Sequence, residues 1–96
     1  RSIIDLYEQL KERVIPLTRS QFAVPVLDQI FQRPIFQSGQ LHFGDEHPPS
    51  RQAVSRLLRA MRRDGILKVT REGRGRRGQV FVFAELVNLC EGHEVF

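Results

Sequence analysis

The segment 50–64 constrains the fold of this 96-residue chain more than any other part of its sequence. Pro49 and Ser50 mark its beginning and Asp64-Gly65 its end, so it has both a start and a stop signal for an α-helix. Its apolar side chains recur every three or four residues, as in a helix that buries one face. They are Val54, Leu57, Leu58 and Met61, with Ala53 and Ala60 as small fillers. We therefore predict a helix over 50–64, with Gly65 in the left-handed conformation after its end.

The positive charge of the chain is concentrated around this segment. Residues 49–79 hold ten basic and two acidic side chains, whereas the remainder holds five basic and nine acidic ones. Thirteen of the fifteen basic residues are arginine, whose planar fork suits phosphates and guanine edges. Such segregation attracts a polyanion to one side of the molecule. The alternative is a solvated helix face followed by a charged hairpin.

A hairpin and a final helix follow the basic helix. We predict strands over 67–71 and 79–83, the second of which is rich in β-branched and aromatic residues. The turn between them, 72–78, contains three glycines and three arginines. A last helix is predicted over 84–91, with Cys90 as a small buried hydrophobe, and 92–96 are expected to be loose.

Two long helices and one short helix are predicted before the basic one. The first, 2–14, is capped by Ser2 and ended by Pro16. Its apolar stripe consists of Ile3, Leu6, Tyr7, Leu10 and Val14. That stripe is either core or a docking surface, and it could equally join two copies of the chain.

The second predicted helix, 20–33, is capped by Ser20 and followed by Pro34. Pro25 either removes one of its hydrogen bonds or delays its start. Its buried face contains Phe22, Val26, Leu27, Ile30 and Phe31. After it we expect a brief strand at 35–37, a short helix around 38–43, and then a loop.

This order of elements predicts the fold class: mainly α with a small β-hairpin. We predict a winged helix-turn-helix with an additional N-terminal helix and a C-terminal helix, in which 50–64 is the recognition helix and 73–78 the wing tip. Ninety-six residues suffice for one hydrophobic core, so 1–96 is expected to be a single domain. Because Arg1 stands first, we expect it to be a fragment of a longer protein.

Other features of the sequence bear on its location. It contains no apolar run of 18 residues and no secretory signal, so no membrane association is expected. Its single cysteine can form no internal disulfide, which fits the cytoplasm.

The predicted recognition helix and wing define the candidate DNA-binding residues. The N-terminal part of such a helix approaches base edges in the major groove. The residues there are Arg51, Gln52, Ser55 and Arg56, and Arg59, one turn further on, is predicted to contact phosphate. The wing arginines Arg74, Arg76 and Arg77 either follow the backbone or enter a narrow minor groove. For Arg62 and Arg63 we favour a structural role, in which their positive charges stabilise the C-terminal end of the helix.

Metal binding and catalysis are weaker hypotheses. The potential metal ligands lack the spacing of known sites, and we predict no metal site among them. They are His42, His47, His93, Cys90, Asp45 and Glu46. The glycines of the turn open no helix, so they form no phosphate-binding loop, and no triad pattern is visible. We therefore expect this chain to be no enzyme and to need no cofactor.

The sequence resembles the C-terminal winged-helix domain of bacterial Fic (filamentation induced by cAMP) family proteins. The matching stretches span nearly the whole chain and are 6–11, 30–36, 50–58, 65–67 and 78–83. The specific signal is the combination of 30–36, which contains Phe-Gln-Arg-Pro-Ile-Phe, with the hairpin from Gly-Ile-Leu at 65–67 to Val-Phe-Val-Phe at 80–83. The stretch 44–49 is longer than the tight turn usual before the recognition helix.

This resemblance implies a parent protein whose Fic domain transfers a nucleotide, usually AMP from ATP with magnesium, to a protein hydroxyl. The motif of that activity, His-Pro-Phe-x-(Asp/Glu)-Gly-Asn-Gly-Arg, does not occur in this chain, so no catalytic residue is carried over. The implied role is regulation or targeting through DNA. The alternative is a protein-interaction module that contacts the Fic catalytic domain, a second subunit or an acidic target.

Overall fold

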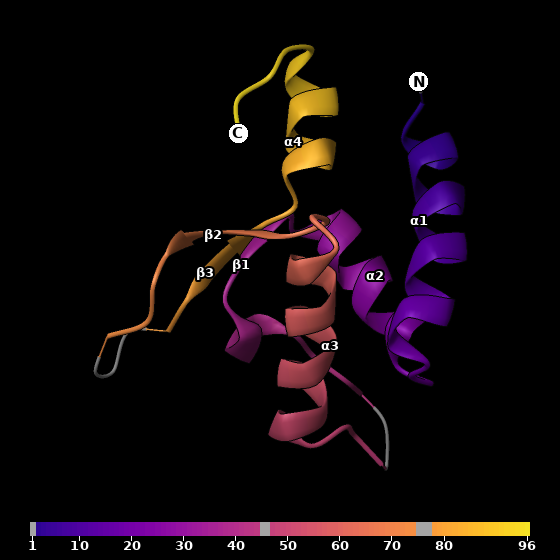
Figure 1. Ribbon diagram of the computed structural model, residues 1–96, viewed down its shortest axis with the longest axis vertical. Helices are drawn as coiled ribbons and strands as arrows, with labels where there is room; N and C mark the ends of the chain where they lie inside the picture. The colour runs from indigo at the N-terminus through magenta and orange to yellow at the C-terminus, as the bar shows by residue number, and fades with distance from the viewer. Residues whose placement is uncertain (1, 45–46, 75–77) are drawn as a thin grey trace.

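The chain folds into helices around a small antiparallel sheet (Figure 1). The computed structural model describes residues 2–44, 47–74 and 78–96. In chain order, the elements are α1 (Ile3–Thr18), α2 (Ala23–Gln32), β1 (Ile35–Phe36), the 3-10 turn η1 (Ser38–Gln40), α3 (Arg51–Arg63), β2 (Lys68–Arg71), β3 (Val80–Val82) and α4 (Ala84–Glu91). The prediction of a mainly helical chain with a small β component is confirmed.

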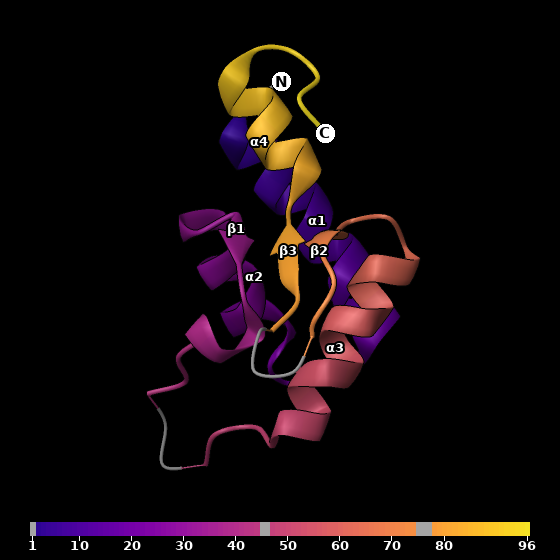
Figure 2. The ribbon, with the colours of Figure 1, turned by 90° about the vertical axis from the view of Figure 1, so that its left-hand side faces the viewer.

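The sheet has three strands, in the order β1-β3-β2, where the sequence predicted a two-stranded hairpin and a separate brief strand (Figure 2). On one side of β3, Ile35 pairs with Val82 and Phe36 with Phe81. On the other side, Lys68 pairs with Val82. Both pairings are antiparallel, so β1 closes the edge that a lone hairpin would leave open.

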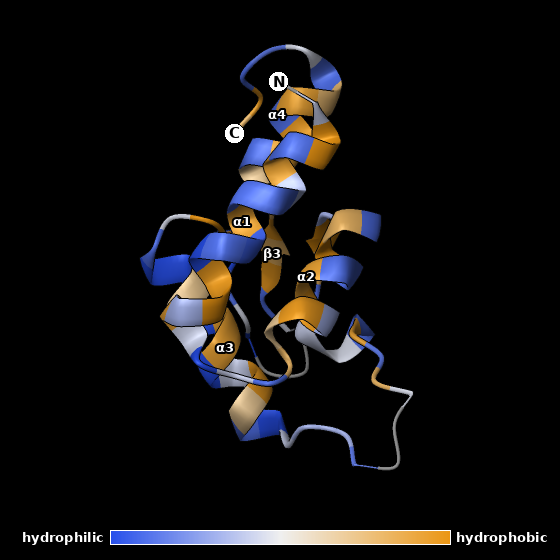
Figure 3. Ribbon diagram, turned by 90° about the vertical axis from the view of Figure 1, so that its right-hand side faces the viewer, coloured by the Kyte–Doolittle hydropathy of each residue, from blue (hydrophilic) through white to orange (hydrophobic). Residues whose placement is uncertain are grey.

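All four helices and the sheet contribute to one cluster of buried apolar side chains. Leu10, Ile30 and Met61, from α1, α2 and α3, are at most 1% exposed. Three aromatic rings run through the cluster edge to face: the Phe31 ring lies 5.2 Å from that of Tyr7 and 5.1 Å from that of Phe83. Figure 3 shows the apolar residues of the helices gathered toward the centre. This burial fixes which side of α3 remains outside.

The ends of α3 are as the sequence predicts. The Ser50 side chain accepts a hydrogen bond from the backbone N–H of Ala53, which satisfies one of the unpaired donors at the helix start. At the other end Gly65 has a φ of +83° and its N–H donates to the carbonyl of Arg62, while the N–H of Ile66 donates to that of Met61. This pair of bonds ends the helix and turns the chain toward β2.

We expect Gly65→Ala to lower the free energy of unfolding by about 1 kcal/mol, because a Cβ disfavours the left-handed conformation. Gly39→Ala is the control, since Gly39 has no positive φ and an added Cβ there meets no atom within 4 Å. Urea unfolding followed by circular dichroism measures both variants. Equal stability of the two would contradict the assignment of conformational strain to residue 65.

The predicted end of the first helix is wrong. Instead of stopping at Val14, α1 continues to Thr18 with Pro16 inside its last turn. A proline so near the end removes only the bond to the Glu12 carbonyl, and Glu12 is exposed to water. The Thr18 hydroxyl donates to the carbonyl of Val14, which further supports this turn. The burial of Leu6, Leu10 and Val14 is confirmed, but Ile3 is 49% exposed.

The predicted start of the second helix is also wrong. The Ser20 hydroxyl accepts from the backbone N–H of Phe22 in the preceding turn, and α2 begins only at Ala23. Pro25 is therefore the third helical residue, where its missing N–H costs no helical bond. The delayed start, one of the two alternatives for Pro25, is the one observed. Between α2 and α3, the helix expected around 38–43 is reduced to η1.

Two predictions about the C-terminal region are corrected. Cys90 is exposed rather than buried, because it lies on the outer side of α4 near its end. The terminal residues are held rather than loose: the Asn88 side chain accepts hydrogen bonds from the backbone N–H groups of Val95 and Phe96. It also donates to the Phe96 carbonyl.

A hydrogen bond from the Tyr7 hydroxyl to the Asp28 carboxylate joins α1 to α2 and, with some burial, raises the pKa of Tyr7 from 10.0 to about 12. In the unfolded chain the phenol ionises near its ordinary value, so its stabilising effect is complete below pH 10 and is lost as the pH rises through 12. We expect the free energy of unfolding to fall more steeply between these values in the wild type than in Tyr7→Phe. Parallel urea titrations test this, and identical pH dependence would contradict it.

Candidate nucleic-acid interface

The exposed side of α3 gathers five predicted site residues in one place. Because the core-facing side of the helix is fixed by Leu57, Leu58 and Met61, the residues on the opposite side face solvent. They line a shallow open depression and are Arg51, Gln52, Ser55, Arg56 and Arg59. The structure therefore brings together every candidate that the sequence assigned to this helix.

The three arginines of this depression have no internal counter-ion. Among the described residues, no ion pair and no side-chain hydrogen bond engages Arg51, Arg56 or Arg59. All three side chains are exposed. Their guanidinium groups therefore present full charge and unused N–H donors to whatever lies against α3.

Both acidic residues of the basic stretch 49–79 are occupied by other arginines. Asp64, at the end of α3, pairs with Arg13 of α1, with 2.6 Å between Nη2 and Oδ2. Glu72, just after β2, pairs with Arg62 at 3.3 Å and accepts from the Gln79 amide at 2.9 Å. Neither carboxylate contacts the three arginines of the depression, so the field there remains positive.

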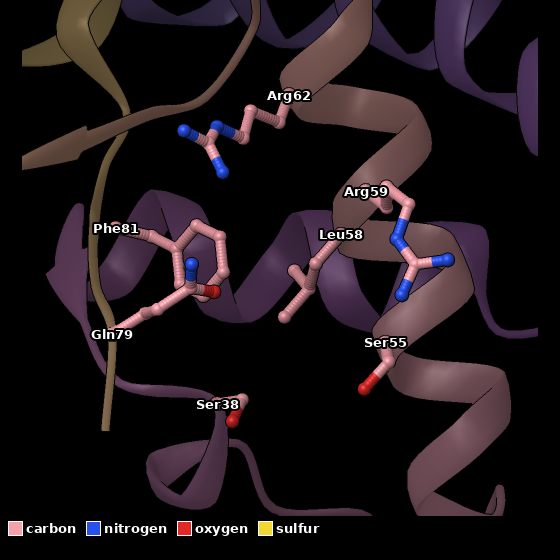
Figure 4. Close-up of a pocket in the computed structure, with 7 residues that line it drawn as sticks. All are labelled: Ser38, Ser55, Leu58, Arg59, Arg62, Gln79 and Phe81. Carbon is pink, nitrogen blue, oxygen red and sulfur yellow. The ribbon is translucent and has the colours of Figure 1, made fainter. Parts of the chain in front are cut away.

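A narrower groove adjoins the depression and lies between α3 and β3 (Figure 4). It has a volume of about 230 Å³ and is lined by Ser38, Ser55, Leu58, Arg59, Arg62, Gln79 and Phe81. Leu58 points into it from α3 and Phe81 faces it from β3. Ser55 and Arg59 line both hollows, so the two form one continuous surface.

Sequence reasoning missed Ser38 and Gln79. No periodicity connects them to α3, since Ser38 lies on η1 and Gln79 just before β3. Only the placement of η1 and β3 beside α3 reveals that they share a groove with Ser55. The Arg62 prediction is extended: it lies in the last turn of α3 as expected, and it also joins the hairpin through Glu72.

The predicted wing residues are less well placed. Arg74 is exposed near the end of the hairpin and lines neither hollow. Arg76 and Arg77 lie outside the described residues. Within the hairpin, the Arg71 guanidinium donates to the carbonyl of Gly78, which ties its two arms together across the turn. Of the predicted site residues that the structure describes, Arg74 is therefore the one that lies outside the α3 depression.

The same described ranges contain neither a cluster of metal ligands nor a helix suited to a membrane. No three His, Cys, Asp or Glu side chains there lie close enough to hold a metal ion, and Asp45 and Glu46 fall outside those ranges. No described helix has the length and apolar character needed to cross a membrane.

Comparison with protein-family models, curated proteins and solved structures found no match for this chain. A function for this chain is therefore inferred from the geometry of α3 and its surroundings.

Proposed function

We propose that the chain is a winged-helix module that binds duplex DNA, with α3 as the recognition helix and β2–β3 as the wing. The succession of α2, β1, η1, α3 and a hairpin supports this fold, as does the pairing of β1 with the second strand of the hairpin. In this interpretation η1 stands in the place of the first helix of the helix-turn-helix, and α1 and α4 are additions.

One observation carries the proposal: three unpaired arginines and two neutral hydrogen-bonding side chains share the exposed side of a single amphipathic helix. A structural role for these arginines would place carboxylates beside them, and the described residues place none. A phosphate backbone satisfies such donors, and its counterion release favours binding.

The dimensions of α3 suit the major groove. Thirteen helical residues extend over about 20 Å, and an α-helix of ordinary diameter enters the groove of B-DNA. Arg51, Gln52 and Arg56 lie in the first two turns, where Arg pairs with guanine and Gln with adenine. Ser55 lies between them, and Arg59 is one turn further, in reach of the backbone. We assign base recognition to Arg51, Gln52 and Arg56, and phosphate contact to Arg59.

The hairpin supplies the second part of the proposed interface. It extends from the side of α3 in Figure 1, and Arg74 is exposed on it. We assign Arg74, Arg76 and Arg77 to the sugar-phosphate backbone or a narrow minor groove, which attracts arginine.

The experiment is fluorescence anisotropy of a labelled duplex of about 20 base pairs, roughly two helical turns, titrated with the chain. Binding should be strong at about 50 mM salt and should weaken steeply as salt is added. A panel of random duplexes and a selected sequence then separates base recognition from general affinity for phosphate. Absence of binding at low salt would reject the proposal.

A second candidate function is protein interaction, and the outer side of α1 favours it. Ile4 is 73% and Ile15 46% exposed, and eleven residues, close to three helical turns, separate them. Glu8, Lys11 and Glu12 lie between them on this side, so a protein partner would combine apolar contacts at the two isoleucines with ion pairs between them. By resemblance, the Fic catalytic domain or a second copy of the chain would cover this face. Sedimentation at increasing concentration tests for the second copy.

The role within a larger protein is proposed from the resemblance to Fic family proteins. DNA binding would then target or regulate a nucleotide-transferring enzyme in the cytoplasm, for which ATP and magnesium would be needed outside this chain. The two surfaces are compatible, because α3 would contact DNA while α1 remained available to a protein partner.

A further inference from the structure

The groove between α3 and β3 contains hydrogen-bond donors for which the described part of the chain supplies no acceptor. The hydroxyls of Ser38 and Ser55 and the guanidinium of Arg59 make no side-chain hydrogen bond or ion pair among the described residues. All three line the same groove, although they come from two separate elements. These donors are exposed and converge on one hollow, so they are available to a single ligand that supplies several acceptors.

The opposite wall of the groove is already satisfied and holds its shape. Glu72 accepts hydrogen bonds from Arg62 on α3 and from Gln79 beside β3, so it connects the two sides. The turn that carries Ser38 is fixed by a reciprocal pair of bonds, one of them from the Gln37 N–H to the Gln40 side chain at 2.8 Å. The positions of the unused donors are thus set by the fold before any ligand binds.

The charge of the groove selects an anion. Its lining contains two arginines and no carboxylate, and only one of those arginines, Arg62, is neutralised by an acidic partner. The groove also continues directly into the α3 depression through Ser55 and Arg59. A polyanion that follows α3 would therefore place one of its charged groups over the groove.

We infer that this groove binds one phosphodiester of the DNA backbone, held by Ser38, Ser55 and Arg59. The inference rests on the proposed DNA binding. It specifies the point at which one DNA strand leaves α3 and passes the hairpin. Its new element is Ser38, which lies outside both the recognition helix and the wing. The phosphodiester oxygens accept from the two hydroxyls and the guanidinium together, which anchors α3 in register along the groove of the duplex.

The test changes the charge at Ser38 in both directions and measures duplex binding over a range of salt concentrations. Ser38 is exposed on a turn, so either side chain fits without repacking. With Ser38→Asp we expect a loss of affinity of roughly tenfold and a log–log salt slope shallower by about 0.9. With Ser38→Lys we expect a gain of roughly fivefold and a slope steeper by about 0.9. A gain in affinity cannot arise from misfolding.

Gln32→Glu and Gln32→Lys are the matched controls. Gln32 is exposed at the end of α2 and lines neither the depression nor the groove, and these changes alter the net charge as the Ser38 variants do. If the Ser38 variants match these controls while Arg51 and Arg56 variants still weaken binding, the inference is wrong and the proposed function stands. If the wild type binds no duplex, both are wrong.

Discussion

Replacing Arg51, Arg56 and Arg59 together by glutamine is expected to lower the affinity for duplex DNA by roughly 100-fold or more. Each side chain is exposed, lacks a partner among the residues that the structure describes, and lies on the same side of α3, so each is assigned a contact with the duplex. A contact of this kind contributes about 1 kcal/mol or more. The salt slope should also become shallower by about 0.9, because Arg59 is the one arginine of the three that is assigned to a phosphate. The preference for a selected sequence should weaken, because Arg51 and Arg56 are assigned to bases.

The matched control removes the same three charges elsewhere. Lys11, Arg19 and Arg33 lie on α1, after α1 and after α2, and none of them lines the depression or the groove. Their triple replacement by glutamine should reduce affinity only through the weaker overall field, by less than about tenfold. Equal losses in the two triple variants would show that net charge, and not the α3 surface, determines binding.

Phe83→Ala is expected to destabilise the fold by about 3–5 kcal/mol, the loss typical of a large buried side chain. Phe83 joins β3 to α4, is fully buried, and packs edge to face on Phe31. Its removal would leave a cavity between α2 and the sheet. For a domain of this size such a loss is a large fraction of the whole free energy of unfolding.

Urea unfolding followed by far-ultraviolet circular dichroism measures this effect. Ile35→Ala is the control: Ile35 is also apolar and also in the sheet, but it is 49% exposed and should cost less than about 1 kcal/mol. A similar small loss for Phe83→Ala would contradict its central place in the core.

Much of the fold could be predicted because local signals agreed with one another. For α3, the Ser50 cap, the spacing of Leu57, Leu58 and Met61, and the left-handed Gly65 all specify the same helix. For β3 and α4, the change from strand to helical spacing at Phe83 gave boundaries within one residue of those observed. Agreement across independent signals is what makes a segment predictable.

The errors arose where a single residue was given a fixed meaning. A proline ends a helix only where the backbone hydrogen bond that it removes is needed. Pro16 lies in the last turn of α1, where the helix continues without that bond. Ser20 can cap a helix or support a turn, and here it supports the turn before α2. The brief strand at 35–37 was expected, but the two residues of β1 carry no pattern that indicates their partner strand, so the pairing of β1 with β3 was not foreseen.

Some residues of the candidate site could be predicted from the sequence and others could not. Arg51, Gln52, Ser55, Arg56 and Arg59 could be grouped in advance, because the helical period alone decides which residues share a face. Ser38 could not be assigned to the site in advance, because its proximity to Ser55 depends on how η1 lies against α3. Tertiary placement of this kind leaves no trace in the spacing of residues along the chain.

The proposed role of the α3 surface is the electrostatic binding of DNA. The salt dependence of duplex binding by the unmodified chain tests this role most directly. About five phosphate contacts, shared among α3, the groove and the hairpin, predict a log–log slope near −4.5. A slope of that size, with tighter binding to a selected sequence than to random duplexes, is the predicted result. Failure to bind any duplex at about 50 mM salt, or a slope near zero, would contradict it.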